Sequence, residues 1–284
     1  MKIIDAHVHF SNIAAFKNCA EHTSLVDYSA EGYLRETEAN GVARSVCMGL
    51  TETNSASFPD EGSKTPMLAD FAETLPKGML LCLGINPHTL SNESVDELER
   101  LAGGGAAGFK IYAGYYRFNV FDPVYGPVYD VAERHNLPIV IHSGETYSQK
   151  GLLEYSHPLA VDRLAVERPG MKIVICHMGA PWINEAASIA CKNGNVYLDI
   201  SGLIVEKADK INSMANKPLV IGRYAQALEL LDRYDRVLYG SDWPLAPMGA
   251  YINFCKRIVP PEFWAEVFYL NACRVFNINN DNKN

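Results

Sequence analysis

The chain opens with MKIIDAHVHF (residues 1–10), an apolar run that ends in two histidines separated by one valine. Successive side chains of a β-strand point to opposite faces, so His7 and His9 are expected on one face of a first strand. The same alternation places Asp5 on the face of His7. Two imidazoles at the end of one strand indicate a metal site, and the remaining ligands must come from elsewhere in the chain.

Further strand-like and helix-like segments alternate along the rest of the sequence. Short runs rich in β-branched residues occupy 44–51, 79–86, 106–113, 138–144, 172–179, 196–202 and 237–244. Apolar residues at helical spacing occupy 33–40, 95–102, 127–135 and 160–169. This alternation predicts an α/β fold with a parallel sheet, and eight such units fit a single (β/α)8 TIM barrel. An open doubly wound sheet is the alternative, but no glycine-rich phosphate turn follows any of these strands.

The barrel is expected over residues 1–278, with 279–284 as a frayed C-terminal tail. The 284 residues are 48% hydrophobic and carry a formal net charge of −8, which disfavours a nucleic-acid-binding protein. Seven dispersed cysteines without a CxxC pair indicate reduced thiols. With no leader and no membrane-length apolar run, a cytoplasmic location without membrane association is expected. The expected partner is a small-molecule substrate, and association into a homo-oligomer is left open.

Several predicted strands end in residues that bind metals. The strand at 138–144 ends near His142, the strand at 172–179 near His177, and the last strand near Asp242. In a barrel the carboxyl ends of the strands meet at one mouth, where His7 and His9 also belong. A lone strand-end histidine is commonly a hydrogen-bonded residue, but polar groups gathered at one end of buried strands favour a site. Imidazole and carboxylate groups suit zinc, and a divalent ion lowers the pKa of bound water.

These segments resemble the amidohydrolase superfamily, and within it the amidohydrolase-related branch of hydrolases and non-oxidative decarboxylases. The resemblance runs through IDAHVHF, GFKIYAGYY, IVIHSGET, IVICHMGAPW, VLYGSDWP and the closing NACRVFNI. It implies that His7, His9, His142 and Asp242 hold a divalent metal, most simply one zinc ion per chain. It also implies that His177 acts beside the metal, where it polarises or positions the substrate.

Lys110, in the fourth strand, admits two interpretations. In some relatives a carboxylated lysine in this region bridges two ions, whereas the GFK context here resembles the one-metal branch. The resemblance therefore predicts an unmodified, buried Lys110, and Asp5 is its expected partner because buried charges are paired. Related deoxyribonuclease barrels typically carry a glutamate ligand on this strand. The sequence GFKIY thus disfavours phosphodiester hydrolysis.

Residues after the strands are candidates for substrate binding. Arg117 is suited to a substrate carboxylate, although a surface-loop arginine is the equal alternative. Glu145 and Tyr112 follow strands and are expected to line the pocket. Trp182 and His88 are further candidates, with packing and turn formation as their respective alternatives.

We predict a metal-dependent hydrolase in which Asp242 is the general base and His177 the second catalytic residue. A decarboxylase that uses the same metal site is the first alternative. A metal-dependent binding protein without catalysis is the second.

Overall fold

The computed structural model describes residues 1–11, 13–54, 58–69 and 75–279. Of the predicted tail at 279–284, all but Asn279 lies outside the described residues. The described strands form one parallel sheet in the order β1 to β8. They are β1 (Ile3–Val8), β2 (Val42–Met48), β3 (Met79–Ile85), β4 (Gly108–Ile111), β5 (Ile139–Ile141), β6 (Ile173–Ile175), β7 (Val196–Asp199) and β8 (Val237–Leu238). The backbone N–H of His9 donates to the carbonyl of Trp243 at 2.7 Å, and that of Asp242 donates to the carbonyl of His7 at 2.9 Å. These bonds join the chain after β8 to β1, and the predicted (β/α)8 barrel is confirmed.

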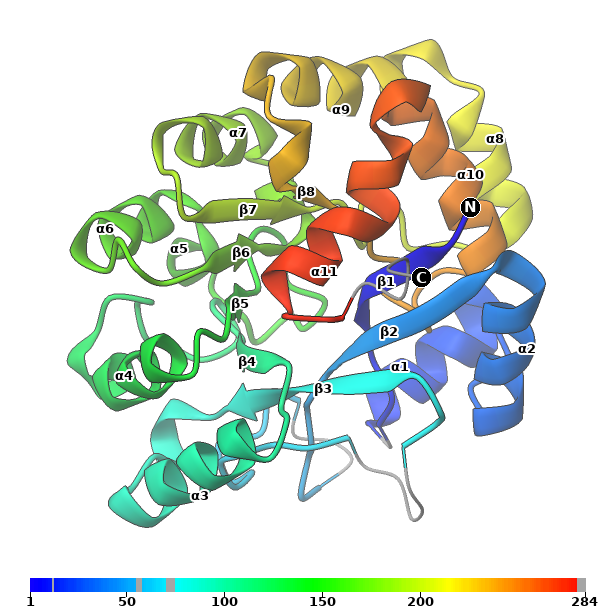
Figure 1. Ribbon diagram of the computed structural model, residues 1–284. Helices are drawn as coiled ribbons and strands as arrows, with labels where there is room; N and C mark the ends of the chain where they lie inside the picture. Colours follow the sequence, from blue (N-terminus) through cyan, green and yellow to red (C-terminus); the bar gives the residue numbers. More distant parts are fainter. Residues whose placement is uncertain (12, 55–57, 70–74, 280–284) are drawn as a thin grey trace.

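Helices surround the strands (Figure 1). The α-helices are α1 (Ala14–Cys19), α2 (Ala30–Asn40), α3 (Asn92–Gly103), α4 (Gly126–Arg134), α5 (Leu153–Ser156), α6 (Leu159–Glu167), α7 (Ile183–Lys192), α8 (Ala208–Ala215), α9 (Pro218–Leu231), α10 (Met248–Ile258) and α11 (Asn271–Val275). Short 3₁₀ or π turns are η1 (Ala20–Ser24), η2 (Pro87–Thr89), η3 (Pro123–Tyr125), η4 (Cys176–Gly179), η5 (Tyr234–Arg236), η6 (Pro261–Phe263) and η7 (Glu266–Leu270). Local sequence sets the ends of α2: the Ser29 side chain accepts from the N–H of Gly32, and Gly41 ends the helix at φ 67°. None of the described helices has the length and apolarity needed to cross a bilayer.

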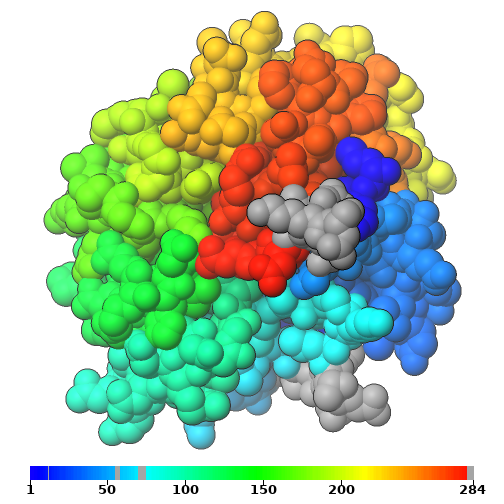
Figure 2. Space-filling model, viewed as in Figure 1, coloured from blue at the N-terminus to red at the C-terminus, as the bar shows by residue number. Residues whose placement is uncertain are grey.

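The helix α11 closes one end of the barrel. The side chains inside the barrel include Ile4, Ala6, Val46, Met48, Cys82, Val140, Val174 and Leu238. Ala272, Val275 and Phe276, from α11 and the residue after it, pack against this cluster. Figure 2 shows the C-terminal helices covering the middle of this face, beside the start of β1. The site is therefore built at the other end, where the strands finish.

The alternation predicted for β1 breaks between Asp5 and Val8. The pairing of β1 with β2 shifts register there, as in a β-bulge. Ala6 packs inside the barrel, whereas Val8 packs between the barrel and its helices. Asp5 lies toward the helix layer, where its charge contributes, after burial, to the raised pKa of Tyr33 on α2. The prediction that Asp5 shares the face of His7 is therefore wrong, because an extra residue separates the two parts of the strand.

Candidate active site

The ends of the strands surround a cavity of about 540 Å³. His9, His142, His177 and Asp242 line it, as the sequence predicts. They follow β1, β5, β6 and β8. The parallel barrel brings the carboxyl ends of these strands to the same mouth, with β5 beside β6 and the chain after β8 bonded to β1.

Three side chains meet closely at one side of this cavity. His7, His9 and Asp242 each offer a ligand atom within 4.8 Å of the other two. Oδ1 of Asp242 lies 3.5 Å from Nε2 of His7 and 3.3 Å from Nε2 of His9. That oxygen is buried and makes no hydrogen bond with the described residues. Two imidazole nitrogens and a carboxylate oxygen that lacks a partner form a donor set that fits a divalent ion.

Asp199, at the end of β7, positions two of the histidines. Its Oδ2 lies 2.8 Å from Nδ1 of His7, which fixes the proton on Nδ1 and leaves the Nε2 lone pair facing His9 and Asp242. Its Oδ1 accepts from the backbone N–H of His177 and of Ser201, both at 3.0 Å, and from the Ser201 hydroxyl. The sequence analysis did not single out Asp199, although an aspartate at the end of a predicted strand was a usable signal.

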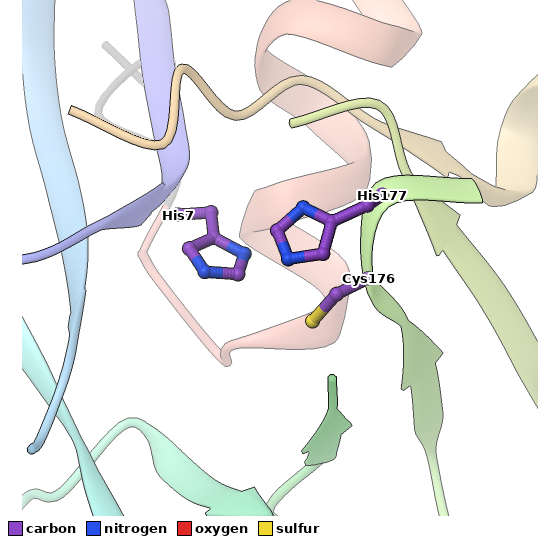
Figure 3. A group of neighbouring side chains, drawn as sticks. All are labelled: His7, Cys176 and His177. Carbon is purple, nitrogen blue, oxygen red and sulfur yellow. The ribbon is translucent and has the colours of Figure 1, made fainter. Parts of the chain in front are cut away.

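His177 lies in η4, directly after β6, with its backbone in the left-handed region at φ 57° and ψ 27°. This conformation is uncommon for a residue with a side chain and is typical of functional sites. Nδ1 of His177 lies 3.1 Å from the carbonyl oxygen of Ser201 and 3.9 Å from Oδ2 of Asp242. Figure 3 shows its ring beside that of His7, with Cys176 next to both. His7, Cys176 and His177 form a second close group with ligand atoms within 4.8 Å of one another.

His142 reaches the cavity but stands apart from the closest donors. Its Nε2 lies 3.1 Å from the carbonyl oxygen of Glu145, and its ring centroid is 5.0 Å from that of His177. It is in neither of the two close groups found among the described residues. That His142 is a metal ligand remains a prediction. To bind a metal through Nε2, the ring would have to leave the Glu145 carbonyl; otherwise it would have to bind through Nδ1.

Burial sets the charge state of the site. Burial, and then the nearby Lys110 charge, lowers the pKa of His7 to about 3, and the pKa of His142 is lowered by burial, His177 and Lys110. Burial alone would raise the pKa of Asp242, but neighbouring histidines outweigh it and hold that pKa below its ordinary value. Neutral imidazoles beside an ionised carboxylate are the protonation states that bind a metal.

Lys110 is buried in the barrel, as predicted, but its expected partner is not there. Its Nζ lies 3.0 Å from Sγ of Cys176, and no carboxylate of the described residues lies within 4.0 Å of it. Oδ1 of Asp5 instead accepts the backbone N–H groups of Ser241 at 2.9 Å and His7 at 3.2 Å. The predicted pair of Lys110 and Asp5 is therefore wrong, because the bulge in β1 turns Asp5 away from the barrel interior.

Two of the five substrate-binding candidates, Tyr112 and Glu145, line the cavity. Arg117 is exposed, and His88 packs its ring against Phe118 with centroids 5.1 Å apart. Trp182 packs against His157 at 4.5 Å. These three do not line the cavity, so the structure does not support their predicted roles.

Several residues of the cavity wall were not predicted from the sequence, among them Phe16, Phe58, Arg223 and Tyr224. Aromatic rings form much of it: Phe16, Phe58, Tyr112, Tyr115, Tyr147 and Tyr224. Arg223 of α9 supplies an exposed cation at the mouth, with a donor nitrogen 3.1 Å from the carbonyl of Pro181. Both α1 and α9 contribute to this wall, and residues inside helices carry no strand-end signal in the sequence.

The model of the amidohydrolase family matches residues 4–278. No curated protein matches the sequence. Among solved structures, 5-carboxyvanillate decarboxylase LigW from Sphingomonas paucimobilis is 16% identical, with a TM-score of 0.63 over 98% of this chain and 99% of that one. A probable 2-pyrone-4,6-dicarboxylic acid hydrolase from Acinetobacter baumannii is 15% identical, with a TM-score of 0.62 over 98% and 100%.

A 5-carboxyvanillate decarboxylase from Novosphingobium aromaticivorans with bound manganese is 12% identical, with a TM-score of 0.57 over 97% of each chain. At these identities the structures show a shared fold, while the family match extends over nearly the whole sequence. The chain belongs to the amidohydrolase family of metal-dependent TIM-barrel enzymes.

Proposed function

We propose that this protein is a metal-dependent hydrolase of a small polar organic substrate. One divalent ion, zinc in the first instance, would be held by His7, His9, His142 and Asp242. The observation that carries the proposal is the buried Oδ1 of Asp242, which has no hydrogen-bond partner among the described residues and lies 3.3–3.5 Å from two imidazole nitrogens. Such an arrangement is costly unless a cation is shared between the three groups.

A bound divalent ion would lower the pKa of a water molecule and polarise a carbonyl group. Asp242 is ionised at neutral pH and lines the cavity, so it is placed to accept a proton from that water and to pass it to the leaving group. Asp199 holds the His7 ring in the tautomer that leaves Nε2 unprotonated.

His177 is placed to act on the substrate. Because the Ser201 carbonyl takes the N–H at Nδ1, the Nε2 atom is left free of that contact. His177 would offer Nε2 to the substrate, where a hydrogen bond donated to an oxygen would stabilise the negative charge that develops there.

Decarboxylation is the second candidate, and the aromatic wall of the cavity favours it. Rings of Phe16, Phe58, Tyr115 and Tyr224 surround the polar groups and suit a planar substrate. Two of the similar structures are decarboxylases of 5-carboxyvanillate, an aromatic carboxylate. In this reaction Asp242 would first take a proton from a hydroxyl group of the substrate or from water. It would then deliver that proton to the carbon whose bond to the carboxylate breaks as CO₂ leaves.

Turnover of a defined panel separates these candidates. The zinc-loaded protein would be incubated with simple lactones, esters and amides, followed by acid release, and with hydroxybenzoic acids, followed by CO₂ release. The Asp242→Asn variant, assayed in parallel, sets the background. Acid release above this background supports the hydrolase, and CO₂ release supports the decarboxylase. If wild-type turnover does not exceed that of Asp242→Asn with any compound of either set, the proposal fails for these substrate classes.

A further inference from the structure

The side chain of Lys110 is a buried cation that faces the cavity floor. It is 1% exposed and lines the cavity. Its described polar contact is the sulfur of Cys176, and no carboxylate of the described residues lies within 4.0 Å of Nζ. A buried charge without an opposite charge costs several kcal/mol, so a group of this kind normally has a partner.

Asp199, at the end of β7, and Asp242, after β8, have other neighbours. Asp199, which faces Cys176, accepts from His7, from the Ser201 hydroxyl and from two backbone N–H groups. Three of these donors share Oδ1, and His7 takes Oδ2. Asp242 lies with His7 and His9. The Lys110 charge is therefore left for a group that enters from the cavity.

We propose that Lys110 anchors an oxyanionic group of the substrate, most simply a carboxylate, at the floor of the cavity. The proposal rests on the function proposed above, because it names the substrate class of that same site. The Tyr112 ring, whose centroid is 5.4 Å from Nζ, covers one side of the ammonium group. If a divalent ion is bound, Asp199 and Asp242 offset its two charges, and Lys110 still requires an anion.

The aromatic side chains of the cavity wall and the ammonium group of Lys110 together indicate which kind of ligand would fit. A planar ring would pack against Tyr112 and Tyr115, while its carboxylate reaches Nζ of Lys110. Benzoate is therefore a suitable probe, and benzamide is its neutral counterpart of the same shape.

Calorimetry would measure the dissociation constants of benzoate and benzamide for wild type, Lys110→Met and Lys2→Met. Each protein would be measured both metal-free and zinc-loaded, at one pH and salt concentration. Lys2 precedes β1 and is exposed at the other end of the barrel, so its variant removes the same charge away from the cavity. We expect Lys110→Met to weaken benzoate binding about 10- to 100-fold in the metal-free protein, as for the loss of a hydrogen bond to a charged group. Benzamide binding should change less than about 2-fold, and Lys2→Met should match wild type.

Equal benzoate affinity in wild type and Lys110→Met would overturn the proposal. So would an intact mass that shows carboxylated Lys110, because a carbamate is not a cation. If Lys110→Met does not fold, a crystal structure of the wild type with benzoate decides: a carboxylate oxygen at hydrogen-bond distance from Nζ supports the proposal, and any other pose contradicts it. Because the metal-free measurement needs neither zinc nor turnover, failure of this inference is distinct from failure of the proposed function.

Discussion

Asp199 determines the geometry of the site through contacts with residues from three strands. It fixes the tautomer of His7, accepts from the backbone of His177 and binds Ser201. We predict that Asp199→Asn lowers zinc affinity about 10- to 100-fold, as is typical when the partner of a ligating histidine is lost. Competition with a chelating indicator would measure the change. Asp162→Asn, which removes a half-buried carboxylate that pairs with Lys192, is the matched control and should leave zinc affinity unchanged. Equal affinities in the two variants would show that Asp199 does not position a ligand.

Variants of Asp242 and His177 should lose catalysis while they keep the metal. We predict that Asp242→Asn largely retains the metal, because the three proposed imidazole ligands and an amide oxygen would still hold it, but loses turnover by about 10²–10⁴-fold. His177→Ala should lower kcat and leave the metal content near that of wild type.

Metal content by elemental analysis, together with kcat on the first substrate found, checks both variants. If His177→Ala loses its metal as readily as His7→Ala does, then His177 is itself a ligand. The close group of His7, Cys176 and His177 would in that case mark a second metal position.

Among single residues, those at the ends of the predicted strands could be assigned to the site from the sequence. His9, His142, His177 and Asp242 reach one cavity as expected. Arg223 was not predicted, because it lies within a helix and approaches the mouth only through the packing of α9. The locations of Arg117, His88 and Trp182 depend on the paths of loops, which strand periodicity does not determine.

The turn after β7 packs closely against the side chains of Asp242 and His177. Gly202 has a φ of +60°, and a Cβ atom there would lie 2.6 Å from Oδ2 of Asp242 and 2.6 Å from Nδ1 of His177. We predict that Gly202→Ala lowers kcat about 100-fold, because a displacement of about 1 Å at a catalytic group has an effect of that size. Gly222→Ala in α9, where a Cβ would have no atom within 4 Å, is the control and should keep wild-type kcat. Wild-type kcat in Gly202→Ala would contradict the close approach.

The bulge in β1 could not be predicted from the sequence. The run IDAHVH alternates apolar and polar residues without interruption, so nothing local marks the register shift between Asp5 and Val8. The shift arises from pairing with β2 and from the bonds that close the barrel at Asp242 and Trp243. Because these contacts are long-range, the strand was predicted correctly and the direction of Asp5 was not.

In the whole molecule, stability and function lie at opposite ends of the barrel. Phe276, beside α11, is only 4% exposed. It packs with the interior side chains at the closed end of the barrel. We predict that Phe276→Ala lowers the free energy of unfolding by about 3–5 kcal/mol and leaves zinc affinity within about 2-fold of wild type. Urea unfolding and chelator competition would measure the two quantities.

Leu219→Ala, at a side chain that is 90% exposed, is the control and should change stability by less than about 0.5 kcal/mol. A loss of zinc affinity in Phe276→Ala that matches its loss of stability would show that the two ends are not independent.

The barrel as a whole was predictable because eight strand and helix units repeat along the chain and most strand residues are buried. The shape of the cavity was not, because side chains from α1 and α9 and from loops complete it.

The zinc content of the protein is the most direct test of the proposed metal site. Wild type and His9→Ala would be stripped with a chelator, incubated with zinc, desalted and analysed for zinc per chain. The account predicts one ion per chain in wild type and well under one in His9→Ala. No stoichiometric zinc in folded wild-type protein, even after incubation, would contradict it.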